Sequence, residues 1–62
     1  MHPDRATLES LATALEDLTR RITEVADRHR DGDDDALASE LYEIERALQS
    51  GIRRLGNLVR EL

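Results

Sequence analysis

Apolar residues recur in this chain at alternating spacings of three and four, in two segments separated by an acidic turn. This spacing is a heptad repeat, which places its members along one side of a helix. The members are Leu8, Leu11, Leu15, Leu18, Ile22, Val25 and His29, followed by Leu37, Leu41, Ile44, Leu48, Gly51, Leu55 and Leu58. When the chain is folded at Asp33, the two stripes meet as mirror images, so that Leu18 faces Leu48 and Ile22 faces Ile44. The pattern predicts an all-α, antiparallel two-helix hairpin with coiled-coil-like packing.

The turn chemistry sets the expected bounds of the two helices. We expect one helical-hairpin domain over 1–62, with helices over 5–30 and 36–61 joined by an acidic turn over 31–35. Aspartates suit helix N-termini because a carboxylate can accept hydrogen bonds from unpaired amides. Asp4 is therefore a candidate cap for the first helix, and Asp34 or Asp35 for the second.

Two glycines weaken the second predicted helix. Gly51 and Gly56 each cost about 1 kcal/mol relative to alanine inside a helix. An interruption at Gly51, with a short third helix from Ile52, is the alternative, but continuity is favoured because the apolar spacing continues through Leu55. Gly51 is expected opposite Leu15, where a missing side chain would let the helices approach closely.

A second strip of small and apolar residues flanks the leucine stripe on both predicted helices. A chain of 62 residues without cysteine buries too little surface for high stability as a lone hairpin, and association commonly supplies the missing burial. We therefore predict a homodimeric four-helix bundle held through this strip. The predicted dimer interface is Ala12, Thr19, Ala26, Ala38, Ile52 and Val59.

Charge and hydropathy exclude several classes of function. A formal net charge of −5 disfavours general nucleic-acid binding, which requires a basic surface. No apolar run reaches the length of a membrane span, and the first residues lack the apolar core of a signal peptide. We expect a cytoplasmic protein that does not bind membranes.

Catalysis finds little support in the leucine stripe. His29 is its only ionisable member, so the predicted core holds no acid, base or nucleophile pair. His29 also lacks a partner ligand, since the other histidine, His2, is expected at the opposite end of the hairpin. We expect no enzyme activity, no catalytic residues, no cofactor and no metal site.

The acidic turn resembles only the start of a calcium-binding EF-hand loop. Asp31, Asp33 and Asp35 occupy its first, third and fifth positions. The sixth position is Ala36 instead of glycine, and the twelfth is Tyr42 instead of glutamate. A solvated cap and turn is the favoured interpretation, and weak cation binding stays open.

The back of the second predicted helix carries an unusual set of polar side chains. Three arginines recur there every seven residues, beside small and amide-bearing residues and one tyrosine. Arginines on such a face can bind a phosphate group or an acidic partner helix. We call this candidate partner or ligand face the arginine face. It consists of Tyr42, Arg46, Gln49, Ser50, Arg53, Asn57 and Arg60.

Residues 46–61 resemble a motif of anti-sigma proteins built as helical hairpins, which bind cyclic di-GMP through Glu-x3-Ser-x2-Arg-x3-Gln-x3-Asp. Ser50 and Arg53 match this motif, and Asn57 and Glu61 match it conservatively. Arg46 departs from it, because the family has glutamate there, and the first predicted helix carries no second copy. The resemblance implies a cyclic dinucleotide as a possible ligand of the arginine face.

These observations predict a small, non-enzymatic protein–protein interaction module that acts as an adaptor, regulator or assembly factor and self-associates. A nucleotide-responsive regulator is the first alternative. The second alternative is a helical subunit of an obligate complex, in which the apolar strip binds a different chain.

Overall fold

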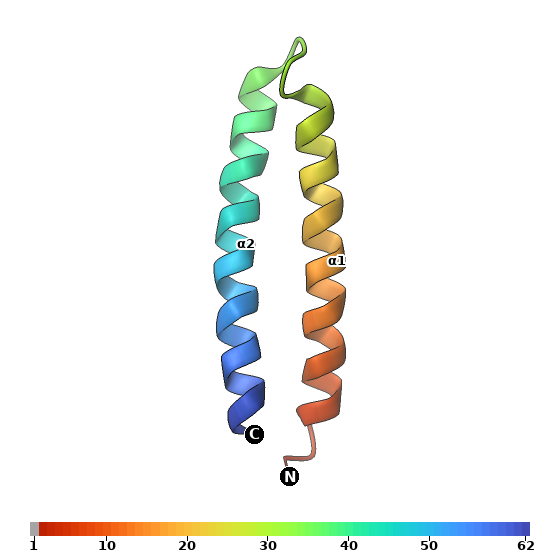
Figure 1. Cartoon of the computed structure of the whole chain (residues 1–62), viewed down its shortest axis with the longest axis vertical. Helices are drawn as coiled ribbons and strands as arrows, with labels where there is room; N and C mark the ends of the chain where they lie inside the picture. The colour runs from red at the N-terminus through yellow and green to blue at the C-terminus, as the bar shows by residue number, and fades with distance from the viewer. Residues whose placement is uncertain (1) are drawn as a thin grey trace.

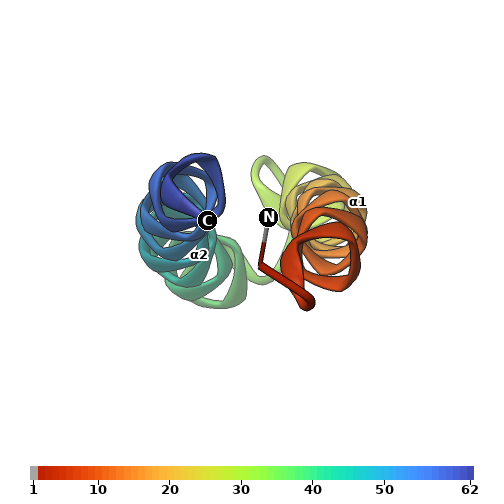
Figure 2. The same ribbon diagram turned by 90° about the horizontal axis from the view of Figure 1, so that it is seen from below.

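Two long helices lie side by side and form the whole fold. The computed structural model describes residues 2–62, in which α1 spans Arg5–His29 and α2 spans Asp35–Glu61. The helices run antiparallel, with the turn at one end and both termini at the other (Figure 1). Seen from that end, they form a single layer two helices wide (Figure 2). The prediction of an all-α hairpin is confirmed, and the molecule is a rod of 50 × 14 × 10 Å.

The helix bounds differ from the expected ones by one residue, because α1 ends at His29 and α2 begins at Asp35. At the start of α2, the Asp34 carboxylate accepts a hydrogen bond from the Leu37 amide at 3.1 Å, so Asp34 is the cap. The Asp4 side chain makes no such bond. Its backbone amide donates instead to His2 Nδ1 at 3.1 Å.

Both glycines of α2 lie inside one continuous helix, as favoured from the sequence. The expected close approach at Gly51 is wrong, because a β-carbon built there meets no atom within 4 Å. The same is true at Gly56. Neither glycine is required by the packing of α1 against α2.

The contact between the helices differs from the predicted seam. The buried residues are Thr19, Ala26, Ala38, Ile52 and Val59, and Ala12 is half-buried in the same heptad series. These six residues are the predicted dimer interface. In the structure the other helix of the same chain covers these side chains, so they form the contact within the hairpin.

The physical reason is that the chain carries two overlapping heptads. Both use the positions of Leu8, Leu15 and Ile22 on α1, and of Leu41, Leu48 and Leu55 on α2. We call these six the shared heptad positions. The predicted seam adds the residue three places after each of them, such as Leu18 after Leu15. The observed seam adds the residue four places after each of them, such as Thr19 after Leu15. A small rotation of each helix about its axis exchanges one set for the other. The observed rotation turns the small side chains inward.

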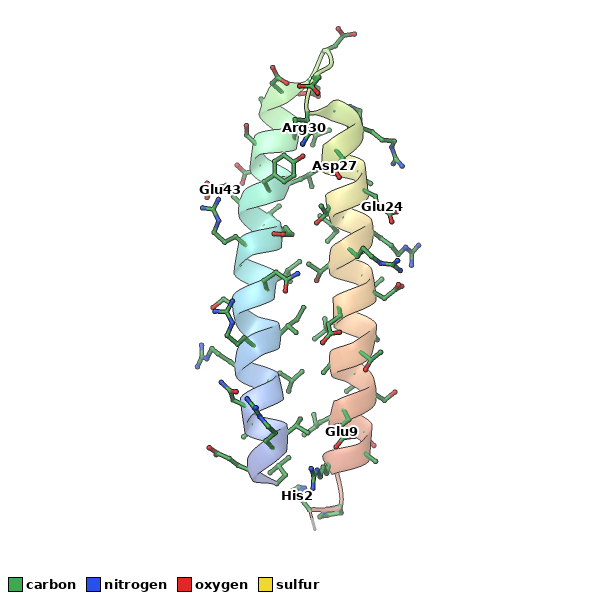
Figure 3. The ribbon with its side chains drawn as sticks, viewed as in Figure 1. His2, Glu9, Glu24, Asp27, Arg30 and Glu43 are labelled. Carbon is green, nitrogen blue, oxygen red and sulfur yellow. The ribbon has the colours of Figure 1, made fainter. Side chains whose placement is uncertain are left out.

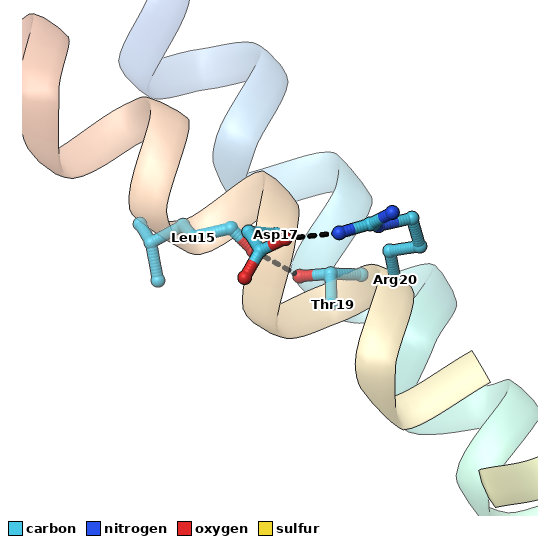
Figure 4. Close-up of polar contacts among 4 residues, drawn as sticks. All are labelled: Leu15, Asp17, Thr19 and Arg20. Carbon is cyan, nitrogen blue, oxygen red and sulfur yellow. Dashed lines mark hydrogen bonds and ion pairs between the residues drawn. The ribbon is translucent and has the colours of Figure 1, made fainter. Parts of the chain in front are cut away.

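Thr19 is the one buried polar side chain among the described residues, with 1% of its surface exposed. Its hydroxyl donates to the Leu15 carbonyl oxygen, one turn earlier in α1, at 2.7 Å (Figure 4). The hydroxyl is therefore satisfied within its own helix, as a buried polar group must be, and the short side chain fits between α1 and α2.

Neither α1 nor α2 has a stretch of the length and apolar character needed to cross a membrane.

Candidate interaction surface

The inward rotation of the small residues leaves large apolar side chains on one open face. Leu11 and Leu18 of α1 are 51% and 50% exposed, and Leu58 of α2 is 50% exposed. Leu15, Leu37 and Ile44 are also exposed. A two-fold axis perpendicular to the plane of the hairpin exchanges α1 and α2 and leaves each face of the hairpin on its own side. The residues three places after the shared heptad positions therefore lie on the same face in both helices. We call this set, Leu11, Leu15, Leu18, Leu37, Ile44 and Leu58, the open leucine face.

Two shallow hollows mark this face. The first lies along α1, where Leu18, Ile22 and Val25 form its apolar floor and Arg21, Glu24 and Arg28 complete its lining. The second lies on α2 and is lined by Gly51, Arg54, Leu55 and Leu58. The missing side chain of Gly51 therefore creates a depression that opens toward solvent rather than toward α1.

Charged residues border the open leucine face. Residues one place before the shared heptad positions form its outer edges, which carry Arg21 and Arg28 on α1 and Glu40, Arg54 and Glu61 on α2. All five are exposed. An apolar strip with a charged border is the usual anatomy of a protein–protein interface.

The arginine face lies on the back of α2, away from the open leucine face. Arg46, Arg53 and Arg60 are exposed, as are the neighbouring Gln49, Ser50 and Asn57. Arg60 donates a hydrogen bond to the Asn57 side-chain oxygen. Within residues 2–62, neither Arg46 nor Arg53 forms an ion pair. The structure thus brings these six predicted residues together on one solvated face.

Tyr42 is the exception among the predicted partner residues. It is half-buried, and its hydroxyl donates to Asp27 Oδ1 at 2.6 Å, which joins α2 to α1. Asp27 and Arg30 both lie near the turn end of α1 (Figure 3). Sequence reasoning missed this contact, because no motif links two single polar residues on different helices.

The hydrogen bond to Asp27 raises the pKa of Tyr42 above the ordinary phenol value of 10.0, since the bond is lost when the phenol ionises. Burial and the Asp27 charge act in the same direction, and the Arg30 charge opposes them. A folded-state pKa above the unfolded one means that this stabilisation is complete below pH 10.0. It disappears as the pH rises through the folded-state value.

We predict that a spectrophotometric titration at about 295 nm, following the only tyrosine of the chain, gives a midpoint above pH 10.0 for the folded protein. The Asp27→Ala variant should titrate closer to the ordinary value, because it lacks the acceptor. Denaturant supplies the reference for the unfolded chain. Equal midpoints for folded and unfolded protein would contradict the hydrogen bond.

Glu45 is half-buried at a position of the observed seam, which corrects the expectation that His29 is the only ionisable seam residue. Thr19 belongs to the same series, and its hydroxyl donates to the Leu15 carbonyl oxygen. Within residues 2–62, no group of three or more histidine, cysteine or acidic side chains is placed to hold a metal ion.

Comparisons with known proteins identify no relative: no family model, no curated protein and no solved structure matches this chain.

Proposed function

We propose that this protein is a non-enzymatic interaction module, in which the open leucine face is the association surface and the arginine face points outward to a protein partner. The observation that carries the proposal is the distribution of large aliphatic side chains. Two of them, Ile52 and Val59, are buried between the helices, whereas the six of the open leucine face are exposed. Full burial of one such side chain contributes about 1.5–3 kcal/mol, so covering this face supplies stability that the single hairpin lacks.

The role proposed is that of a cytoplasmic adaptor, regulator or assembly factor that self-associates. Association through the open leucine face leaves Arg46, Arg53 and Arg60 on the outside. Arginines bind carboxylates and phosphates through two parallel hydrogen bonds, which suits an acidic partner helix. The border charges restrict which surfaces can approach, because like charges brought together oppose binding.

We predict that the double variant Leu18→Glu with Ile44→Glu is monomeric at concentrations where the natural chain associates. Each substitution places a charge in the centre of the open leucine face, and burying an unpaired carboxylate costs several kcal/mol. Light-scattering mass after size exclusion, measured at several concentrations, reports the change.

The matched control is Gln49→Glu with Ser50→Glu, which adds the same charge at exposed positions on the back of α2. It should keep the mass of the natural chain. Equal masses for the two double variants would contradict the assignment of the open leucine face as the association surface.

A nucleotide-responsive regulator is the second candidate function. It is favoured by the exposure of Ser50 and Arg53 side by side on one helix, with Arg53 outside every ion pair of residues 2–62. A ligand that binds only the folded chain raises its melting temperature. Thermal unfolding with and without cyclic di-GMP therefore separates this candidate from the adaptor.

A further inference from the structure

The open leucine face is complementary to itself, and from this we infer its occupant and orientation. We propose that a second copy of this chain covers it with the turns at opposite ends, so that α1 packs on α1 and α2 packs on α2. In this arrangement, Ile44 of each copy enters the hollow at Gly51 of the other. The inference deepens the proposed function, because it rests on association through the same face.

The size of the exposed surface fits one half of a dimer. A compact monomer of this mass exposes about 4,000 Å², whereas the hairpin exposes 4812 Å². The excess is roughly 800 Å², which is similar to the accessible surface that each partner buries in an interface of ordinary size. The excess arises because the molecule is elongated and only one layer thick (Figure 2).

The apolar side chains of α2 in one copy are complementary to those of α2 in a second, antiparallel copy. A two-fold axis near Ala47 places Ile44 opposite Gly51 and Leu37 opposite Leu58. Ile44 is 41% exposed, and the α2 hollow lies at Gly51 between Leu55 and Leu58. A β-branched side chain thus meets the one place on the face where a side chain is missing. On α1, the same axis places Leu18 opposite Leu18 and Leu11 opposite Val25.

The border charges agree with this pairing. The two-fold axis near Ala47 brings Glu40 of one copy opposite Arg54 of the other, and the symmetry repeats the pair. On α1, Arg28 comes opposite Thr7, and Arg21 comes opposite Ala14. Glu40 and Arg54 are therefore paired, and Arg21 and Arg28 meet uncharged residues, which sets orientation more than affinity.

The alternative orientation has both turns at the same end and places α1 of one copy on α2 of the other. Ala47 then lies beside Arg21 of the other copy, far from its own equivalent. The two orientations are therefore distinguished by a single residue that is close to itself in only one of them.

The natural chain has no cysteine, so a single introduced thiol reports how close a residue lies to the same residue of the second copy. We expect Ala47→Cys to form a disulfide-linked dimer under mild oxidation about tenfold faster, or more, than Ser50→Cys at equal concentration, because neighbouring thiols have an effective concentration in the millimolar range. Ser50 lies on the back of α2 and serves as the matched control. Both positions are exposed, and circular dichroism verifies that each variant is folded.

Two results overturn the inference, and they are distinguishable. If light scattering gives a dimer but Ala47→Cys is linked no faster than Ser50→Cys, the orientation is wrong and association through the open leucine face stands. If light scattering gives a monomer at every concentration, self-association itself is wrong. Rapid linkage of Ala47→Cys that is abolished by Leu18→Glu with Ile44→Glu supports the inference.

Discussion

Replacing Ile52 by arginine together with Val59 by glutamate is expected to unfold the hairpin rather than to release a folded monomer. These side chains are 9% and 6% exposed between α1 and α2. A charge placed in such a site without a buried partner costs several kcal/mol, which is comparable to the whole stability of a domain this small. Circular dichroism at 222 nm should show the loss of most helical signal at 25 °C.

The matched variant carries the same new charges on the open leucine face of α2. Ile44→Arg with Leu58→Glu changes residues that are 41% and 50% exposed, so the isolated hairpin should stay helical while association is lost. The comparison separates the two apolar sets of the chain. A helical monomer from Ile52→Arg with Val59→Glu would mean that the small-residue strip faces outward, contrary to the structure.

Enlarging Ala26 to leucine is expected to destabilise the protein by about 1–3 kcal/mol, as measured by urea unfolding. Ala26 is 0% exposed, so three additional carbon atoms must displace α2. The gain in apolar surface does not offset this strain, because the extra atoms find no space between the helices.

Ala6→Leu is the control for this prediction, because Ala6 is exposed on the same helix. Its effect on the free energy of unfolding should stay within about 0.5 kcal/mol, as for most surface substitutions. Equal effects of the two substitutions would show that the helices do not meet at Ala26.

The architecture was predictable because it depends on features that act over many residues. Heptads on both sides of an Asp–Gly turn allow one simple solution, an antiparallel pair of nearly equal helices. The cap at Asp34 and the continuity of α2 through Gly51 also follow from local rules of helix ends and apolar spacing. None of these features depends on which side of each helix faces the other.

The seam was not predictable, because that choice depends on a rotation that the pattern leaves free. Leu15 and Leu48 belong to both heptads, and only the second member of each repeat, three or four places later, distinguishes them. Hydrophobicity favours Leu18 over Thr19 as a core residue. The observed packing places Thr19 inside, because small side chains let two helices approach closely and leave the leucines together on one face.

The candidate interaction residues were also predictable only in part. The exposure of Arg46 and Arg53 follows from their distance from every apolar position, so it was predictable from spacing. The position of Tyr42 was not, because it depends on where Asp27 lies across the seam.

The two ends of the described chain are held together at one end of the rod, where the His2 amide donates to the Leu62 carbonyl oxygen at 3.2 Å. Any sequence joined to either end of the hairpin therefore emerges on the same side, opposite the turn (Figure 1). In the antiparallel dimer proposed above, the corresponding ends of the second copy emerge at the far end of the rod, which is 50 Å long. Such a dimer acts as a spacer of fixed length that points two attached groups in opposite directions.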